Sequence, residues 1–451
     1  MIVAGPGTGK TTTLVHKLIY LITECSVAPQ RILAVTFTRS AAREIKERIK
    51  TQGEAFQWDS AWVETFHALA LGILKKENYP FGAETDWTAL LNQGQLNFDD
   101  LILYANKLFY EKPEIQKQYR DQFSYIIVDE FQDTSAIQYQ FLKNLWGENI
   151  CVIGDPDQAI YQFSSERFDP FVQFRTDWPS AHILSLMDNY RTQKTILAAA
   201  QQVIDKNGTS IPRSLVAQNG NGLPIEIFPF HSERQEAEMT VRKIESLLGG
   251  ASGFSIDSQW AEKDNEKYSY GLSDIAIFYR FHVQARMLED ALKRAGLPYH
   301  TFGRKPKKNG EEISNSHEME DFKNNEEGAP ALFGFRPEAI SLMTLHRSKG
   351  LEFSVVFILG CEEGVIPYYG QEKSNFLLLK EEERRLFYVG MTRAKSRLFL
   401  SWAKSRFLFG KTMDQGPSCF LQEFEKDLQE WKERLQQKKK RPLQPTLFDP
   451  N

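Results

Sequence analysis

A glycine-rich run near the start of the sequence has the residue types and spacing that bind phosphate. Ala4-Gly5-Pro6-Gly7-Thr8-Gly9-Lys10-Thr11 follows a short apolar stretch and precedes a helical pattern. Glycines let backbone N–H groups turn inward around phosphate oxygens, while the positive end of the following helix points at them. A lysine at position 10 reaches the terminal phosphates, and the next hydroxyl can bind Mg²⁺. The run predicts a P-loop whose nucleotide-binding residues are Gly5, Pro6, Gly7, Thr8, Gly9, Lys10, Thr11 and Thr12.

A pair of carboxylates later in the chain completes this chemistry. The apolar run Tyr125–Val128 ends in Asp129 and Glu130. We expect Asp129, with Thr11, to bind Mg²⁺, and Glu130 to orient and deprotonate the attacking water. Each motif alone has a simpler explanation, a chance Gly-rich turn or a strand capped by solvated acids. Their combination favours hydrolysis of a nucleoside triphosphate.

Short apolar runs alternating with helical patterns must position these residues. Such alternation is typical of parallel sheets covered by helices on both faces. The fold class is therefore α/β, with one set of expected strands at Met1–Ala4, Ile32–Thr36, Tyr125–Val128, Ile150–Ile153 and His182–Leu186. A second set is expected at Ile225–Phe230, Asp274–Tyr279, Ala339–Leu345, Val355–Leu359 and Arg397–Ser401.

The two sets of strands predict two α/β domains with interruptions. We assign residues 1–67 and 123–186 to the first domain, and 187–304 and 338–420 to the second. Residues 68–122 read as a short helical insertion, and 305–337 as a polar loop. Residues 421–451 are expected to form a C-terminal helix and a flexible tail.

Composition excludes several classes of protein. The formal net charge is −4, so contacts with nucleic acid must come from local grooves rather than from a global positive field. No N-terminal signal peptide is visible, and no apolar stretch reaches the roughly 20 residues of a membrane span. The four cysteines lack metal-ligand spacing, which fits a reducing cytoplasm best.

Further motifs narrow the choice among P-loop proteins. They read, in order, ILAVTFTRSAAREIKERI (32–49), ETFH (64–67), DEFQDT (129–134), IGDPDQAIYQF (153–163), NYRT (189–192), MTLHRSKGLEF (343–353) and EEERRLFYVGMTRAK (381–395). This series resembles the successive motifs of superfamily 1 DNA helicases of the UvrD/Rep/PcrA type, in a minimal form with reduced insertions. The resemblance implies two RecA-like domains with an ATP cleft between them.

The resemblance also implies roles for single residues at that cleft. Gln158 corresponds to the sensor of the γ-phosphate and attacking water, and Tyr190 to the tyrosine that stacks on adenine. Arg191 and Arg393 correspond to arginine fingers, one from each side, and planar guanidinium groups suit the spread charge of phosphoryl transfer. Glu352 is expected to respond to nucleotide or DNA. The implied cofactors are ATP and Mg²⁺.

Contacts with single-stranded DNA follow from the same resemblance. Aromatic faces stack on bases without regard to sequence. For the aromatic and histidine side chains the alternatives are core packing and a structural histidine. The expected DNA-binding residues are Phe37, Thr65, His67, Tyr161, Phe163 and His346.

Three features differ from the usual family pattern. Phe163-Ser164-Ser165-Glu166 stands where Trp-Arg-Gly-Ala is usual, and Thr12 replaces a common arginine. The adenine-specifying glutamine segment found upstream of the P-loop is also absent from the sequence. An upstream segment or a separate N-terminal polypeptide is expected to supply it.

The tail carries one more motif. Gln444, Leu447 and Phe448 match the QxxLF peptide that docks on bacterial sliding clamps, with a disordered tail as the alternative. For the whole chain we expect an ATP-dependent 3′→5′ helicase or translocase acting on single-stranded DNA and 3′-tailed duplexes, in repair or replication. Two alternatives stay open, a DNA-stimulated ATPase that does not unwind alone and a degenerate DNA-binding regulator.

Overall fold

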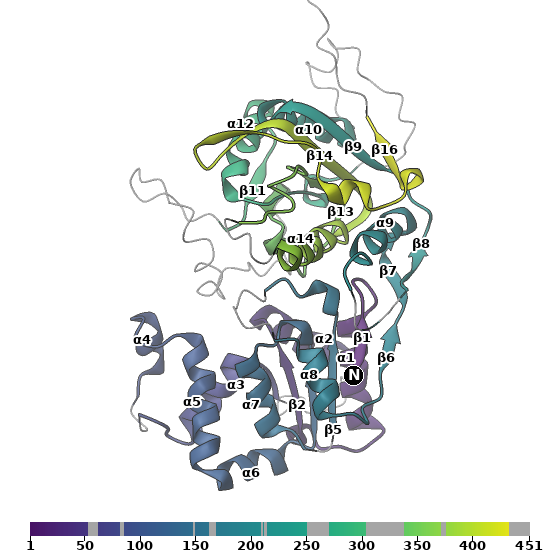
Figure 1. Cartoon of the computed structure of the whole chain (residues 1–451). Coiled ribbons are helices and arrows are strands. Elements are labelled where there is room, and N and C mark those ends of the chain that lie inside the picture. Colours follow the sequence, from purple (N-terminus) through teal and green to yellow (C-terminus); the bar gives the residue numbers. More distant parts are fainter. Residues whose placement is uncertain are drawn as a thin grey trace, which may run out of the picture.

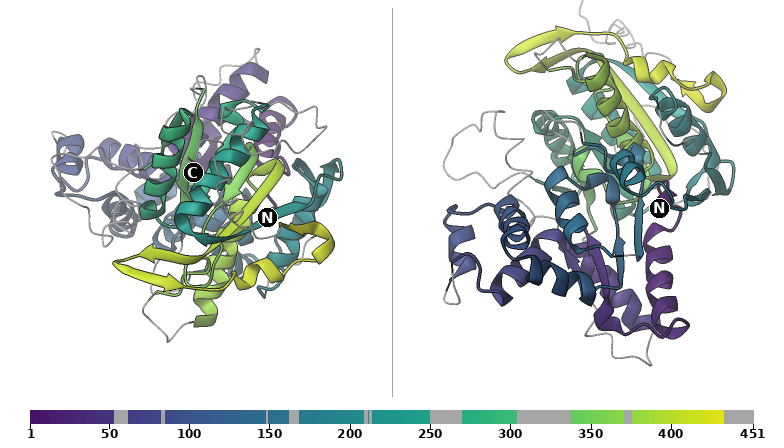
Figure 2. Two further views of the ribbon diagram at one scale, coloured as in Figure 1. Left: turned by 90° about the horizontal axis from the view of Figure 1, so that it is seen from above. Right: turned by 60° about the horizontal axis from the view of Figure 1, so that its bottom comes forward.

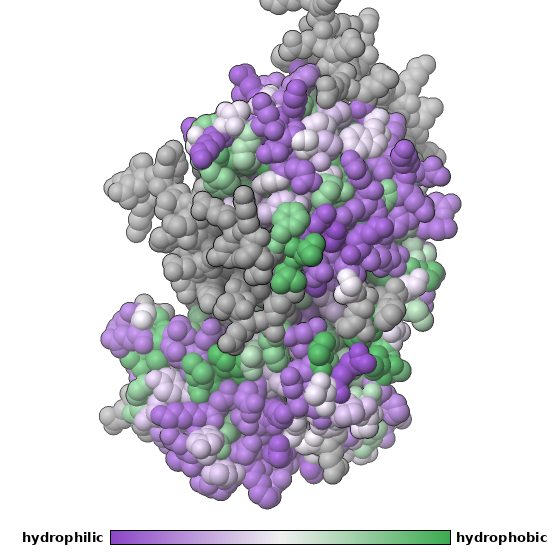
Figure 3. All heavy atoms as spheres, viewed as in Figure 1, coloured by the Kyte–Doolittle hydropathy of each residue, from purple (hydrophilic) through white to green (hydrophobic). Residues whose placement is uncertain are grey.

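Two lobes, each built on a parallel sheet, make up the protein (Figure 1). The structure is a computed structural model that describes residues 1–52, 62–81, 85–147, 149–161, 168–208, 211, 214–249, 270–303, 338–370 and 376–432. The lobes lie one above the other in Figure 1, and hydrophobic residues gather along their boundary in Figure 3. Among the described residues, no helix combines the length and apolar character of a membrane span.

The first lobe contains a six-stranded sheet in the order β3-β2-β4-β5-β1-β6. All of its neighbouring strands pair in parallel. The strands are β1 (Ile2–Ala4), β2 (Ile32–Thr36), β3 (Trp62–Thr65), β4 (Tyr125–Val128), β5 (Asn149–Gly154) and β6 (Leu184–Leu186). The central strands are buried on both faces, so their sequences are continuously apolar rather than alternating.

Helices cover both faces of this sheet. Apolar residues of α1 (Lys10–Thr23) and α2 (Arg39–Gln52) form a core with one face. The opposite core gathers apolar residues of α3 (Phe66–Lys76), α5 (Phe98–Glu111), α7 (Ala136–Leu145) and α8 (Pro170–Asp177). Strand β3 was not among the expected strands.

A helical insertion separates β3 from β4. It comprises most of α3, together with α4 (Trp87–Asn92), α5 and α6 (Pro113–Gln122). The right-hand view of Figure 2 shows α4–α6 projecting to the side of the first lobe. Asn97 and Asp100 form a reciprocal capping box that fixes the start of α5.

The second lobe holds an eight-stranded sheet in the order β11-β12-β10-β13-β14-β9-β16, with β15 attached to β14. Pairing is parallel except for the β14–β15 hairpin. The strands are β9 (Ile225–Ser232), β10 (Ile275–Tyr279), β11 (Tyr299–Thr301), β12 (Ile340–Thr344), β13 (Phe353–Ile358), β14 (Ala394–Leu408), β15 (Lys411–Asp414) and β16 (Gln429–Trp431). One face packs on α9 (Lys194–Ile204) and α14 (Phe376–Met391), the other on α10 (Glu233–Leu247) and α12 (Ala285–Ala295).

A small two-stranded sheet connects the lobes. Its strands, β7 (Asp188–Gln193) and β8 (Val216–Asn219), pair in parallel at the edge of both lobes in Figure 1. Helix α9, which packs in the second lobe, lies between these two strands in the sequence.

The C-terminal helix expected from residue 421 onward is wrong for the described residues. Short 3₁₀ turns at Cys419–Gln422 and Lys426–Leu428 lead into strand β16, which pairs with β9. Lys432 then forms an ion pair with Glu226 of β9, 3.5 Å between Nζ and Oε2. Backbone pairing and this charge contact outweigh the helical propensity of a Glu- and Lys-rich segment. The polar loop 305–337 and the tail from residue 433 lie outside the described residues.

Candidate active site

The glycine-rich loop connects β1 to α1 with the backbone geometry expected of a P-loop. Gly7 and Gly9 have φ of 66° and 85°, left-handed values that glycine adopts without strain. The hydroxyl of Thr8 donates to the carbonyl of Gly5 at 2.9 Å and closes the turn. Helix α1 begins at Lys10, so its free N–H groups face the loop.

Strand β7 packs directly against this loop. The side-chain amide of Asn189 donates to the carbonyl of Pro6 at 2.6 Å, and the N–H of Tyr190 donates to that of Gly7 at 2.9 Å. A Cβ at position 7 would lie only 2.5 Å from the Cβ of Arg191, so the close approach requires glycine. Tyr190 and Arg191 are therefore held beside the phosphate loop, with the Tyr190 ring 63% exposed.

The two carboxylates lie where β4 ends. Asp129 is buried, while Glu130 has a left-handed φ of 47°, a strained conformation for a residue other than glycine. Lys10 Nζ lies 4.0 Å from Glu130 Oε2, and the side-chain amide of Gln132 donates to the same carboxylate. The P-loop lysine and the candidate base are thus neighbours.

The pKa values of the two acids shift in opposite directions. Burial and repulsion from Glu130 raise the pKa of Asp129. Burial opposes ionisation of Glu130 too, but the charges of Lys10 and Lys349 outweigh it and lower the pKa of Glu130. Asp129 Oδ1 is buried without a hydrogen-bond partner among the described residues. A bound cation would satisfy that oxygen, so the site fits Mg²⁺.

Side chains from the second lobe reach across to the first. Lys349 Nζ lies 2.6 Å from both carboxylate oxygens of Asp133 and donates to the carbonyl of Gln158 at 2.8 Å. Arg393, buried to 2% exposure, donates to the side-chain oxygen of Gln158 at 3.4 Å. Burial, reinforced by Arg191, lowers the pKa of Arg393 to about 9. Gln158 of the first lobe is therefore contacted by both Lys349 and Arg393 of the second lobe.

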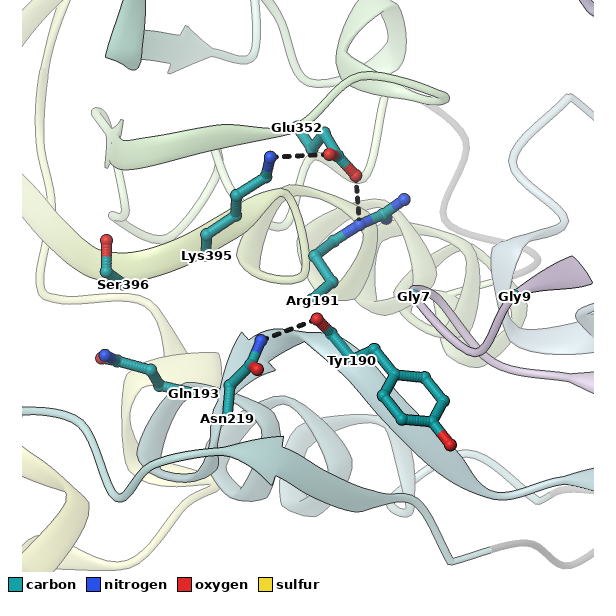
Figure 4. A pocket seen from close by; sticks show the side chains of 9 residues that line it. All are labelled: Gly7, Gly9, Tyr190, Arg191, Gln193, Asn219, Glu352, Lys395 and Ser396. Carbon is teal, nitrogen blue, oxygen red and sulfur yellow. Dashed lines mark hydrogen bonds and ion pairs between the residues drawn. The ribbon is translucent and has the colours of Figure 1, made fainter. Parts of the chain in front are cut away.

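A cavity of about 470 Å³ opens beside the P-loop, within the usual range for ligand sites. Its walls come from the loop, from β7 and β8 and from the second lobe (Figure 4). Glu352 Oε2 lies 2.6 Å from Arg191 Nε, and Glu352 Oε1 lies 2.7 Å from Lys395 Nζ. The lining residues are Gly7, Gly9, Tyr190, Arg191, Gln193, Asn219, Glu352, Lys395 and Ser396.

The residues expected to contact DNA fall into two groups. The rings of Phe37 and Tyr161 stack with centroids 6.0 Å apart and planes within 5°, and the Tyr161 hydroxyl donates to the carbonyl of His346 at 3.1 Å. By contrast, Thr65 is buried, and its hydroxyl caps α3 by accepting the N–H of Ala68 at 3.2 Å.

The two candidate histidines differ in burial, because His346 is buried and His67 is partly exposed. His346 is buried, and burial together with the charge of Arg280 lowers its pKa well below the usual range, so the imidazole is neutral. His67 packs on the ring of Phe98, with centroids 5.5 Å apart. Phe163 lies outside the described residues, as do the tail residues Gln444, Leu447 and Phe448.

Several residues of this site were not predicted from the sequence, among them Lys349, Asp133 and Lys395. Lys349 and Asp133 lie within recognised motifs, but local spacing gave no sign that they would pair across the lobes. Lys395 is the last residue of the motif 381–395 and lines the cavity. Its place in that motif, two residues after a predicted arginine finger, was the available signal.

This arrangement defines a P-loop ATPase whose nucleotide site is shared by two RecA-like lobes. Models of the UvrD/REP helicase N-terminal domain match residues 1–93 and 87–179. Models of the UvrD-like helicase C-terminal domain match residues 184–306 and 302–405. The chain belongs to the UvrD/Rep family of ATP-dependent DNA helicases, within superfamily 1.

Curated relatives agree with this assignment. ATP-dependent DNA helicase PcrA of Staphylococcus aureus is 27% identical over 637 aligned positions, which cover 95% of this chain and 84% of the relative. PcrA of Bacillus subtilis is 28% identical over 642 positions, covering 95% and 84%. PcrA of Leuconostoc citreum is 26% identical over 642 positions, covering 95% and 83%.

Proposed function

We propose that this helicase moves 3′→5′ along single-stranded DNA and displaces the complementary strand of a 3′-tailed duplex. The observation that carries the proposal is the convergence at one nucleotide site of Lys10 and Glu130 from one lobe and Arg393 from the other. Hydrolysis at such a site changes how strongly the lobes attract each other. A cycle of closing and opening is what moves the two lobes along a strand.

The residues around the cavity are proposed to have different roles in hydrolysis. Lys10 binds the terminal phosphates, and Glu130, held ionised by neighbouring cations, orients and deprotonates the attacking water. Gln158 positions that water, while Arg191 and Arg393 neutralise the charge that develops on the transferred phosphoryl group. Thr11 and Asp129 would hold the proposed cofactor Mg²⁺, which would supply positive charge to the phosphate groups.

Adenine is proposed to stack on Tyr190. The ring is exposed beside the phosphate loop, and its backbone is tied to the loop through the carbonyl of Gly7. An exposed aromatic face at that place can accept a base without moving the strand that carries it.

The proposed path of the DNA strand passes over the stacked pair Phe37 and Tyr161, which joins the two lobes through the carbonyl of His346. Base stacking there is worth about 1–3 kcal/mol per base and tolerates any sequence. His67 and Phe163 are proposed to extend this surface. Thr65 and His346 are proposed to support this surface from below without touching the bases, because both side chains are buried.

A strand-displacement assay on three substrates tests the polarity. We expect displacement from a duplex with a 3′ single-stranded tail, and none from a 5′-tailed or a blunt duplex of the same sequence. Displacement from the 5′ tail alone would contradict the proposal. Stimulation of ATP hydrolysis by DNA without any displacement would favour the alternative, a translocating ATPase that does not unwind alone.

The C-terminal tail and the cysteines suggest a partner and a cellular compartment. The tail residues Gln444, Leu447 and Phe448 are proposed to dock on a bacterial sliding clamp during repair or replication. All four cysteines are free thiols, which supports a reducing cytoplasm as the place of action. Calorimetry of a 438–451 peptide with the clamp should show micromolar binding that Leu447→Ala with Phe448→Ala removes. Absence of binding by the unmodified peptide would contradict the docking proposal.

A further inference from the structure

One carboxylate in the cavity is shared by two cations. Figure 4 shows Glu352 between Arg191, which comes from β7, and Lys395, which comes from β14. The two contacts use different oxygens, Oε2 to Arg191 at 2.6 Å and Oε1 to Lys395 at 2.7 Å. Glu352 can therefore release one cation without losing the other.

The contact with Glu352 competes with the role proposed for Arg191. Arg191 contacts Glu352 through Nε alone, so moving the guanidinium far enough to neutralise the γ-phosphate weakens or breaks this ion pair. When Arg191 moves to the nucleotide, Glu352 loses one of its two cationic partners next to a highly charged triphosphate. A lone carboxylate there would repel the phosphates and attract Arg191 back.

We propose that Lys395 is a positioning residue that keeps Glu352 neutralised, so that Arg191 can transfer to the γ-phosphate of ATP. In the nucleotide-free protein, Glu352 holds Arg191 at the edge of the cavity. In the ATP-bound protein, Lys395 alone holds Glu352. The inference rests on the proposed function of Arg191, and it gives a role to a lysine outside the predicted site.

Exposure of the three side chains agrees with such an exchange. Arg191, Glu352 and Lys395 are 21%, 37% and 42% exposed, so solvent screens the ion pairs and breaking one of them is not prohibitive. Burial raises the pKa of Glu352, but the charges of Arg191 and Lys395 outweigh it and lower the pKa, which keeps the carboxylate ionised. The carboxylate therefore stays charged and can pair with either cation.

Nucleotide binding by the full chain tests this role without requiring hydrolysis or DNA. We expect Lys395→Met to weaken binding of the non-hydrolysable analogue AMP-PNP about fivefold, the effect of a partly exposed ion pair. Binding of ADP, which lacks the γ-phosphate, should change less than twofold. Lys395→Arg should retain affinity for both nucleotides. The matched control is Lys404→Met, an exposed lysine on the same strand, β14, which lies outside the cavity lining.

A double substitution separates positioning from direct contact with the nucleotide. Once Glu352→Gln has removed the carboxylate, Lys395→Met should cause no further loss of AMP-PNP affinity. Equal losses for AMP-PNP and ADP, or additive losses in the double variant, would overturn the role of Lys395. A wild-type chain that binds neither nucleotide would instead defeat the proposed function, and with it this inference.

Discussion

Lys10 stands at the first turn of α1, beside the phosphate loop and 4.0 Å from Glu130. Lys10→Ala removes the cation that would hold the terminal phosphates, and we expect ATP turnover to fall to background while the thermal unfolding midpoint stays near that of the wild type. Lys17→Ala, two helical turns along α1, is the matched control and should keep full turnover. Near-normal turnover in Lys10→Ala would place the active site elsewhere.

Glu130 combines an unusual backbone with an unusual charge state. Its φ of 47° directs the side chain toward Lys10, and the neighbouring cations keep it ionised. Glu130→Gln should bind ATP but hydrolyse it at least ~10²-fold more slowly, the usual contribution of a general base. Single-turnover hydrolysis with parallel calorimetry measures both quantities. Unchanged hydrolysis would show that Glu130 is not the general base but only an acidic residue at the end of β4.

At the scale of elements, a buried ionic cluster stabilises the second lobe. Arg406 of β14 lies 2.5 Å from Glu236 of α10 and also contacts Glu362, which follows β13. Ser401 and the N–H of Gly360 donate to Glu236 as well, at 2.7 and 3.1 Å. The cluster fixes α10 against the sheet.

Arg406→Met leaves two buried carboxylates without their cation, and we expect a loss of about 3–5 kcal/mol in the free energy of unfolding. Burial raises the pKa of Glu362 even beside Arg406. Arg406 opposes that rise, so the pKa of Glu362 should be higher still in the variant. The folded variant therefore takes up protons more readily than the folded wild type, and the loss should shrink as the pH falls from about 8 to about 5. Denaturant unfolding at both pH values measures this. A variant as stable as the wild type would show that the cluster is dispensable.

The sequence predicted most of the strands within one or two residues, because the buried strands are continuous apolar runs. It missed β3, β7, β8, β11, β15 and β16, which are short strands of three to six residues, and Gln429–Trp431 is too polar to resemble a buried strand. The P-loop and the pair Asp129 and Glu130 were predictable, because each is a run of consecutive residues with a recognisable pattern. The pairing of Lys349 with Asp133 depends on two lobes meeting, which no local pattern encodes.

For the whole molecule, DNA binding must work against a formal net charge of −4. We expect affinity for single-stranded DNA to be nearly independent of sequence and to fall linearly on a plot of log affinity against log salt. Fluorescence anisotropy with mixed-sequence and homopolymer strands at several salt concentrations measures both properties. Strong preference for one duplex sequence would contradict a strand-tracking mechanism.

Coupling between ATP hydrolysis at the lobe boundary and a DNA strand is measurable as steady-state ATP hydrolysis by the wild-type chain, with and without an unstructured single strand. We expect slow hydrolysis alone and a rise of at least about tenfold with DNA, because strand binding brings Arg191 and Arg393 to the nucleotide. If hydrolysis is absent, or proceeds at the same rate with and without DNA, the two lobes do not couple ATP to a strand.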